Sequence, residues 1–204
     1  MNKTSRALLG TASLLLLSLY VLPLWSISLV APQYPEGLGM KIWINTITGE
    51  GPHDLRNINN LNHYIGMKEI HPESIPELRL MPIIVGVLAA AGALSAVLGR
   101  RWMLYGWFGL LAVSAIAGLV DFWLWEYDYG HNLNPEAAIK IPGMSYQPPL
   151  FGSKMLLNFK AVSLPAFGGW LAIMSGLLAA TAVLLEIRRA RQAEPAAEEG
   201  VASA

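Results

Sequence analysis

The sequence predicts an all-α membrane protein: a four-transmembrane-helix bundle with a small extracytoplasmic cap formed by two outer loops. Of its 204 residues, 54% are hydrophobic and only 14% are charged. Long apolar segments lie at residues 7–30, 81–99, 102–125 and 163–187. A helix needs about 20 apolar residues to cross about 30 Å of hydrocarbon, so we expect each segment to span the membrane.

The first apolar segment is expected to be an uncleaved anchor rather than a signal peptide. Lys3 and Arg6 form a basic region before it, as they would in either case. The apolar run from Ala7 to Val30 is longer than the roughly 7–15 apolar residues of a signal peptide. We therefore expect residues 1–30 to hold a cytoplasmic end and the first helix.

Basic residues predict how the chain is oriented in the membrane. They cluster at three places that four crossings would bring to one side: Lys3 and Arg6, Arg100 and Arg101, and Arg188, Arg189 and Arg191. Basic residues favour the cytoplasmic side. The sequence thus predicts a multi-pass protein of the bacterial inner (cytoplasmic) membrane, with both termini in the cytoplasm.

This orientation divides the chain into consecutive parts. The helical hairpin is expected at 81–125 and the last helix at 163–187. The two outer cap segments are 31–80 and 126–162, and the small polar residues of the tail at 188–204 predict disorder.

The first outer segment shows signs of its own secondary structure. Apolar side chains alternate with others at Leu38, Met40, Ile42 and Ile44, which predicts a strand. Asp54 is a candidate N-cap for a helix beginning at Leu55. In the second apolar segment Gly92 and Ala96 are spaced for close packing between helices, within the chain or in a homodimer.

Histidine and methionine recur at helical spacing in the same outer segment. His63, Met67 and His71 stand at i, i+4 and i+8, so His63 and Met67 share a face if the helix continues. Imidazole and thioether without thiolate suit copper better than zinc or calcium. The alternative is structural, with Met67 packing beside Ile65 and His63 forming hydrogen bonds to nearby asparagines.

Residues 121–154 are unusually rich for a stretch that begins at a membrane helix end. Acidic side chains at Asp121, Glu126 and Asp128 could orient metal-binding imidazoles or dock a partner. Asp121 is expected near the membrane interface, where acids are costly and usually functional or paired with lysine.

Two further candidate copper ligands lie in the same stretch. His131 follows Asp128 at a spacing of three residues. Met144 lies in a segment that Pro148 and Pro149 hold extended. If the two outer segments form one cap, His131 and Met144 should approach His63 and Met67.

Several classes of function are disfavoured. The absence of cysteine excludes disulfides, thiolate zinc sites and iron–sulfur clusters. A formal net charge of +0 indicates no nucleic-acid partner. The chain carries no recognisable hydrolase, metalloprotease, P-loop or dinucleotide-binding motif in context, so we expect no enzymatic activity.

Two stretches carry a resemblance: NINNLNHYIGMKEIHPESIPE at 57–77, and residues 121–154. Together they resemble a group of small four-helix membrane proteins of unassigned function, encoded near maturation factors of copper enzymes, particularly nitrous oxide reductase. The resemblance implies a role in copper supply or maturation outside the cytoplasm.

The predicted function is a membrane accessory protein, or metallochaperone, that handles or delivers copper at the extracytoplasmic face. Its expected partners are the lipid bilayer and an extracytoplasmic copper protein or another membrane subunit. The alternative is a structural or assembly subunit whose cap docks a partner and binds no metal. A third class is a membrane enzyme acting on lipid or quinone, with Asp121 or His131 as the acid–base group.

Overall fold

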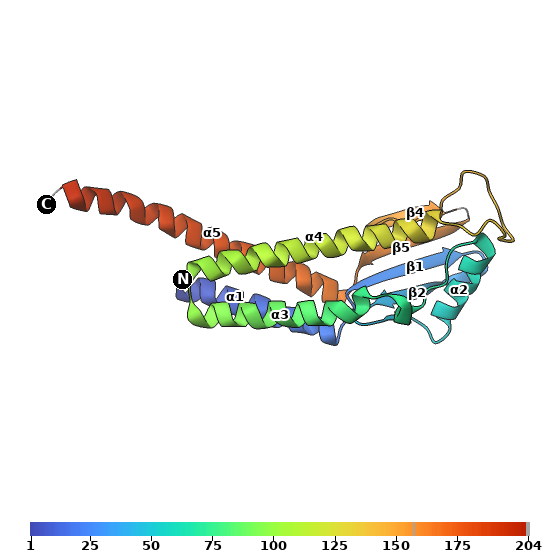
Figure 1. Ribbon diagram of the computed structural model, residues 1–204, viewed down its shortest axis with the longest axis horizontal. Helices are drawn as coiled ribbons and strands as arrows, with labels where there is room; N and C mark the ends of the chain where they lie inside the picture. The colour runs from blue at the N-terminus through green and yellow to red at the C-terminus, as the bar shows by residue number, and fades with distance from the viewer. Residues whose placement is uncertain (157, 203–204) are drawn as a thin grey trace. The chain divides into compact units, whose positions relative to one another are not determined.

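The computed structural model describes residues 1–156 and 158–202, with only the backbone described for 193–202. In these residues the fold is not the predicted all-α four-helix bundle: five α-helices accompany a five-stranded antiparallel sheet. The elements in chain order are α1 (Lys3–Leu17), the 3₁₀ turn η1 (Ser18–Tyr20), β1 (Trp25–Ala31), β2 (Tyr34–Ile42), β3 (Ile47–Gly49), α2 (Asp54–Ile65), the 3₁₀ turn η2 (Pro72–Ser74), α3 (Glu77–Leu98), α4 (Arg101–His131), β4 (Gly152–Leu156), β5 (Phe159–Pro165) and α5 (Phe167–Ala202) (Figure 1).

The chain divides into two compact units. The first contains Met1–Ser18, Ile84–Ser114 and Leu171–Ala204, and the second contains Leu19–Ile83 and Ala115–Trp170. Within the described residues, three helices are long and apolar enough to cross a membrane: α3, α4, and α5 over Phe167–Gln192. The expectation of a membrane protein is thus supported at this level.

The predicted first membrane helix at 7–30 is wrong. α1 has 15 residues, and at 1.5 Å per residue this is about 22 Å, short of the roughly 30 Å of hydrocarbon. Pro23 cannot continue a hydrogen-bonded helix, and the apolar residues beyond it form β1. The apolar run is therefore a short helix followed by a strand of the sheet.

The predicted last membrane helix at 163–187 also begins in a strand. Its first residues belong to β5, and α5 starts only at Phe167, beyond Pro165. Gly169 explains the position of this start. A Cβ there would lie 2.2 Å from the Leu24 carbonyl oxygen, so α5 can begin against the chain before β1 only with glycine.

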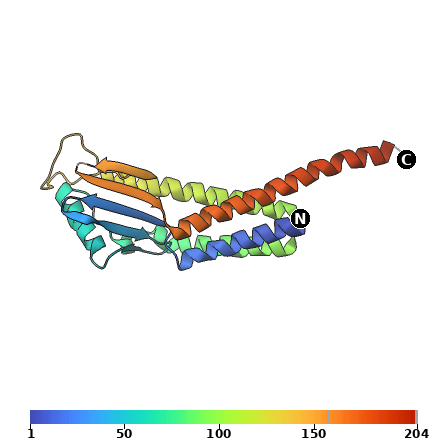
Figure 2. The same ribbon diagram turned by 180° about the vertical axis from the view of Figure 1, so that it is seen from behind.

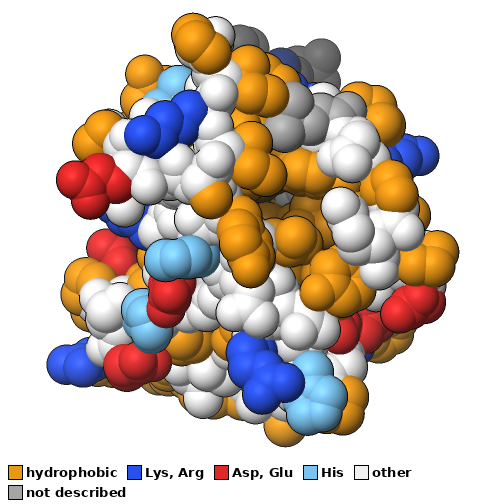
Figure 3. Space-filling view, turned by 90° about the vertical axis from the view of Figure 1, so that its right-hand side faces the viewer, with side chains coloured by type: hydrophobic (Ala, Val, Ile, Leu, Met, Phe, Trp, Pro, Cys, Tyr) orange, Lys and Arg blue, Asp and Glu red, His pale blue; other side chains and the backbone are white. Residues whose placement is uncertain are grey.

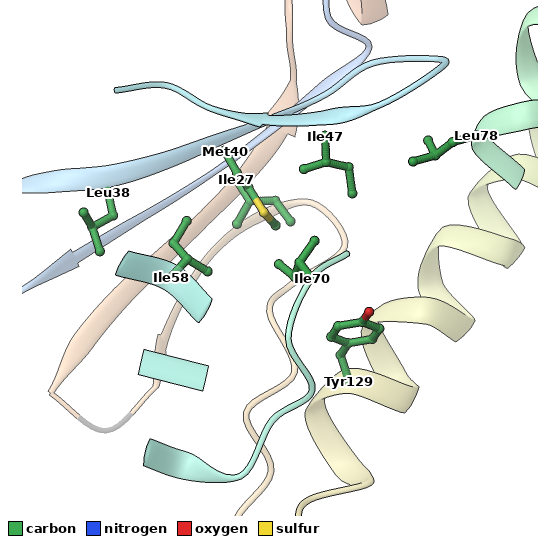
Figure 4. Packing of buried hydrophobic residues seen from close by; sticks show 8 residues of the cluster. All are labelled: Ile27, Leu38, Met40, Ile47, Ile58, Ile70, Leu78 and Tyr129. Carbon is green, nitrogen blue, oxygen red and sulfur yellow. The ribbon is translucent and has the colours of Figure 1, made fainter. Parts of the chain in front are cut away.

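The second unit is built on the sheet, whose strand order is β3-β2-β1-β5-β4 (Figure 2). β1 pairs with β2 with Ile27 opposite Met40, and it pairs with β5 on its other side with Ile27 opposite Ser163. Eight buried side chains of the unit form an apolar cluster: Ile27, Leu38, Met40, Ile47, Ile58, Ile70, Leu78 and Tyr129 (Figure 4).

Both secondary-structure predictions for the first outer segment are confirmed in outline. The alternating residues form β2, although Ile44 lies beyond its end, and α2 covers the predicted helix. Asp54 is the first residue of α2 rather than its N-cap. Its Oδ2 accepts hydrogen bonds from the backbone N–H of Gly39 (2.9 Å) and Gly51 (3.0 Å), which lower the pKa of this carboxyl.

The first unit joins α1 to parts of α3, α4 and α5. Gly92 lies at a close contact between the helices: a Cβ there would be 2.1 Å from Ser13 Oγ and 2.7 Å from the Trp107 ring. At one end of the unit, Glu186 accepts hydrogen bonds from Asn2 N (2.9 Å) and from Arg101 Nε (2.8 Å). These contacts bring the basic cluster of Lys3 and Arg6 close to that of Arg100 and Arg101, beside α5, which carries the third cluster.

Candidate functional site

The second unit contains a cavity of about 60 Å³ with almost entirely apolar walls. The inner face of the sheet, α2 with the chain that follows it, the last turns of α4 and the chain around residue 146 contribute these walls. Figure 3 shows hydrophobic side chains gathered around a hollow on the face of this unit that points to the right in Figure 1, with charged and histidine side chains farther out.

A buried acidic residue lies beside this apolar cavity. Glu126 lines it from α4, its side chain is 0% exposed, and neither carboxylate oxygen has a hydrogen-bond partner among the described residues. Its neighbour on the helix, Trp125, and Tyr129 one turn further line the same cavity. The last turns of α4 therefore present an acid from within an aromatic face, where an unpaired charge is costly.

Two other polar atoms of the cavity residues are also unpartnered in the described part of the chain. They are the Trp125 indole Nε1 and the Tyr146 hydroxyl, and both are buried. Buried polar groups are normally hydrogen-bonded, so three side chains with unpartnered polar atoms beside one cavity set this part of the unit apart from an ordinary apolar core.

Aromatic rings support this side of the cavity. The Trp125 and Tyr129 ring centroids are 4.2 Å apart, and Trp125 stacks on Phe122 at 6.4 Å. Phe122 in turn meets Trp25 of β1 edge-on at 5.6 Å. This packing restricts Trp125 and thereby the neighbouring backbone that carries Glu126.

The predicted helical face of His63, Met67 and His71 does not form. α2 ends at Ile65 because Gly66 adopts a left-handed conformation (φ 81°), and the chain turns away. His63 is exposed on α2, and Met67 is half-buried and lines the cavity. His71 is exposed, with its ring nitrogens 3.2 Å from a Glu69 oxygen and 3.4 Å from a Glu73 oxygen.

Like His63 and His71, the remaining two predicted ligands do not line the cavity. His131 is exposed and stacks on Tyr127, with ring centroids 4.0 Å apart. Met144 is half-buried in a turn in which its N–H donates to the Ile141 carbonyl. Of the five predicted ligands, only Met67 contributes to this site, and the described residues contain no group of three or more His, Cys, Asp or Glu placed to hold a metal ion.

The two outer segments nevertheless contact each other. Asn134 N donates to the Gly66 carbonyl at 2.7 Å, and Ile139 N donates to the Tyr64 carbonyl at 2.9 Å. These backbone contacts hold the chain after α4 against the end of α2. The segments form one folded unit without bringing their imidazoles into one cluster.

The three predicted acids have different surroundings. Asp121 is exposed, Asp128 forms an ion pair with Lys68 and a hydrogen bond with Asn132, and Glu126 alone of the three is buried beside the cavity. Asp128 is thus held by a cation rather than beside an imidazole. Glu126, expected only to orient ligands or dock a partner, is itself the acidic group of the site.

Sequence reasoning missed Met40, Trp125 and Tyr146 as cavity residues. The strand alternation placed Met40 on one face of β2 with Leu38, but not beside α4. A signal was present in α4, where Phe122, Trp125 and Tyr129 recur at helical spacing around Glu126. This pattern places Glu126 on an aromatic face of the helix and predicts that its carboxyl is buried.

No protein-family model matches the chain, and no curated protein is significantly similar to it. The function must therefore be inferred from the site itself.

Proposed function

We propose that the protein is a membrane accessory protein that binds copper in the cavity of its second unit at the extracytoplasmic face and delivers it to an acceptor. The observation that carries this proposal is the fully buried Glu126 carboxyl, which has no protein partner among the described residues. An unpaired carboxyl in apolar surroundings favours its protonated form, and a cation that bound beside it would displace this proton and balance the carboxylate charge.

The cavity volume favours an ion over an organic ligand. A water molecule occupies about 30 Å³ of liquid, and a protein cavity that binds benzene measures about 150 Å³. The cavity of about 60 Å³ is smaller than this benzene site, which favours a small ligand over a quinone ring. This comparison weighs against the enzyme that would act on lipid or quinone.

Copper is supported by the segments that form the site. Met67 and Glu126 come from the two stretches that resemble proteins encoded near copper-enzyme maturation factors. The chain contains no cysteine, so a thiolate site for zinc is excluded. The exposed His63 and His131 remain candidates for transient contact with an incoming or leaving ion.

The proposed location follows from the helices and their flanking charges. α3 and α4 can each cross a membrane, and Arg100 and Arg101 lie between them. The positive-inside rule assigns this turn and the adjoining N-terminal residues to the cytoplasm of a bacterial inner membrane. The ends of α3 and α4 that lead into the sheet then lie outside, where an extracytoplasmic copper protein or another membrane subunit could receive the ion.

Copper titration of the full chain in detergent tests this function. We expect about one bound copper per chain and weaker binding by Glu126→Gln, which keeps the shape but removes the charge. Glu136→Gln is the matched control, because Glu136 is exposed and outside the cavity. Absence of copper binding, or equal affinity in Glu126→Gln and the control, would contradict the proposal.

One observation favours the alternative of a docking subunit that binds no metal. β4 is an edge strand of the sheet, and Phe151 and Met155 beside and within it are 61% and 63% exposed. Exposed apolar side chains on a strand edge are typical of protein contacts. This function would be favoured if a stable partner copurifies with the protein, if Phe151→Ser abolishes its binding, and if the purified complex contains no copper.

A further inference from the structure

We infer that one end of the first unit binds the phosphate group of an anionic phospholipid, with Lys3, Arg100 and Arg188 as its cationic contacts. This basic end consists of the start of α1, the turn between α3 and α4, and the part of α5 around Glu186. The inference is independent of the proposed function, because the cavity proposed for copper belongs to the second unit.

A single buried carboxylate joins the three segments of the basic end. The Glu186 side chain is 0% exposed and accepts hydrogen bonds from Asn2 N at 2.9 Å and from Arg101 Nε at 2.8 Å. Glu186 and both of its partners each stand within two residues of a further exposed cation. These cations, far apart in the sequence and gathered by one carboxylate, are Lys3, Arg100 and Arg188.

A second set of contacts holds α1 beside the turn between α3 and α4. Arg6 Nε donates to the Ala96 carbonyl at 2.8 Å, and Arg6 Nη2 donates to the Val97 carbonyl at 2.7 Å, both in the last turn of α3. Figures 1 and 2 both show the start of α1, marked N, next to this turn. Backbone carbonyls satisfy the donors of Arg6 but do not neutralise its charge, so Arg6 adds to the positive potential.

The described side chains do not balance the charge of the basic end. Glu186 is the only acid among the described side chains of the first unit, and Arg101 pairs with it. Arg191 is not counted, because Glu194 stands three residues after it in the sequence. The remaining basic residues, exposed and without an ion pair among the described residues, are Lys3, Arg6, Arg100, Arg188 and Arg189. Such a concentration of cations attracts anions, and arginine is well suited to phosphate.

Exposed apolar side chains beside these cations indicate that the anion carries an apolar chain. Val97 and Trp102, on either side of Arg100 in the chain, are 69% and 67% exposed. Leu184, one helical turn before Arg188, is 55% exposed. A turn between two helices that can each cross a membrane lies where hydrocarbon meets headgroups. A phospholipid places its phosphate and its acyl chains on the two parts of this surface, whereas a soluble phosphate covers only the cations.

The test removes charge and leaves the described ion pairs intact. The test variant is Lys3→Gln/Arg100→Gln/Arg188→Gln. Arg188→Gln alone changes one exposed residue and keeps the test decisive if the triple variant does not fold. The control variant removes the same number of charges from exposed residues of the second unit that form no ion pair among the described residues: Arg56→Gln/Lys140→Gln/Lys160→Gln.

The full chain in neutral detergent is mixed with equal amounts of phosphatidylglycerol, which is anionic, and phosphatidylcholine, which is zwitterionic. Native mass spectrometry then counts the lipids that stay bound. We expect the natural sequence to retain phosphatidylglycerol preferentially. Each basic residue near an anionic surface contributes about fivefold to binding, so Arg188→Gln should bind this lipid about fivefold more weakly and the triple variant at least about 10-fold. The control variant should bind like the natural sequence, and added salt should weaken binding by both.

Three results would overturn the inference. The first is equal retention of the two lipids by the natural sequence. The second is the same loss of phosphatidylglycerol in the test and control variants, which would show that only net charge matters. The third is displacement of the lipid by an equal concentration of glycerol phosphate, which would assign the site to a soluble phosphate. Copper titration of the same preparation tests the proposed function separately, so failure of one proposal is distinguishable from failure of the other.

Discussion

Arg101 Nε donates a 2.8 Å hydrogen bond to Glu186 Oε2, and the Glu186 side chain is fully buried within the first unit. Removing the arginine leaves a buried carboxylate that still accepts from the Asn2 N–H but has lost its cation. Because the Arg101 side chain is 49% exposed, the cost should lie between about 1 kcal/mol for a surface pair and about 3–5 kcal/mol for a buried one.

Thermal unfolding of Arg101→Ala in detergent checks this cost. Arg100→Ala is the control, since Arg100 is exposed and forms no ion pair among the described residues. We expect Arg101→Ala to melt clearly below the control. Equal melting temperatures would show that the pair contributes no net stability.

Gly92 should tolerate no side chain. In Gly92→Ala the new methyl group would meet Ser13 Oγ at 2.1 Å and the Trp107 ring at 2.7 Å, and overpacking of this kind costs about 1–3 kcal/mol. At Gly106, on the same bundle, a Cβ would meet nothing within 4 Å, so Gly106→Ala should be neutral or slightly stabilising. Thermal melting of the two variants tests this difference. Equal stability of Gly92→Ala and Gly106→Ala would show that α1 and α4 can separate at Gly92.

Asp54 should make the second unit sensitive to acid. Hydrogen bonds from the N–H groups of Gly39 and Gly51 lower the pKa of this carboxyl in the folded state. The contribution of Asp54 to the free energy of unfolding is therefore fully present above the unfolded pKa of about 3.9. It is lost as the pH falls through the lower pKa of the folded state.

Replacing Asp54 by alanine should cost about 2 kcal/mol at neutral pH, because hydrogen bonds to charged groups contribute about 1.5–3 kcal/mol. The difference in unfolding free energy between Asp54→Ala and the natural sequence should shrink as the pH falls toward about 3, below the unfolded pKa. Measurement of urea midpoints across pH checks this, and a constant difference would exclude an ionised Asp54 as its cause.

The Tyr146 hydroxyl should be dispensable for stability without a ligand. It is buried with no partner among the described residues, and an unsatisfied buried polar group costs about 1–3 kcal/mol. We expect Tyr146→Phe to be at least as stable as the natural sequence. Tyr20→Phe is the contrast, since the Tyr20 hydroxyl donates at 2.6 Å to the Pro82 carbonyl and its loss should destabilise by about 1 kcal/mol. A clear loss of stability in Tyr146→Phe would indicate that this hydroxyl is satisfied in solution.

Several parts of the fold could be predicted from local pattern. The apolar runs that became α3 and α4 are long, uninterrupted and separated by two arginines, so length alone identified them. The two misassigned runs each contain a proline that separates a strand from a helix, Pro23 in one and Pro165 in the other. A buried strand is as apolar as a membrane helix, so hydropathy could not separate them.

The candidate site was predicted only in part. Met67 and Glu126 were among the expected residues, but they were assigned to a cluster with histidines that are exposed instead. The left-handed turn at Gly66 ended the helix that would have aligned His63 with Met67. Met40 and Tyr146 were missed because they reach the cavity only after segments far apart in the sequence have packed together.

By itself the sequence determined the long apolar helices, the places where basic residues gather and the absence of any thiolate chemistry. These depend on composition and on neighbours within a few turns of chain. Only the tertiary structure decided that β1 and β5 are strands and that Met40, Met67 and Glu126 come together around one apolar cavity. Strand pairing and burial arise from contacts between distant residues, which no local pattern records.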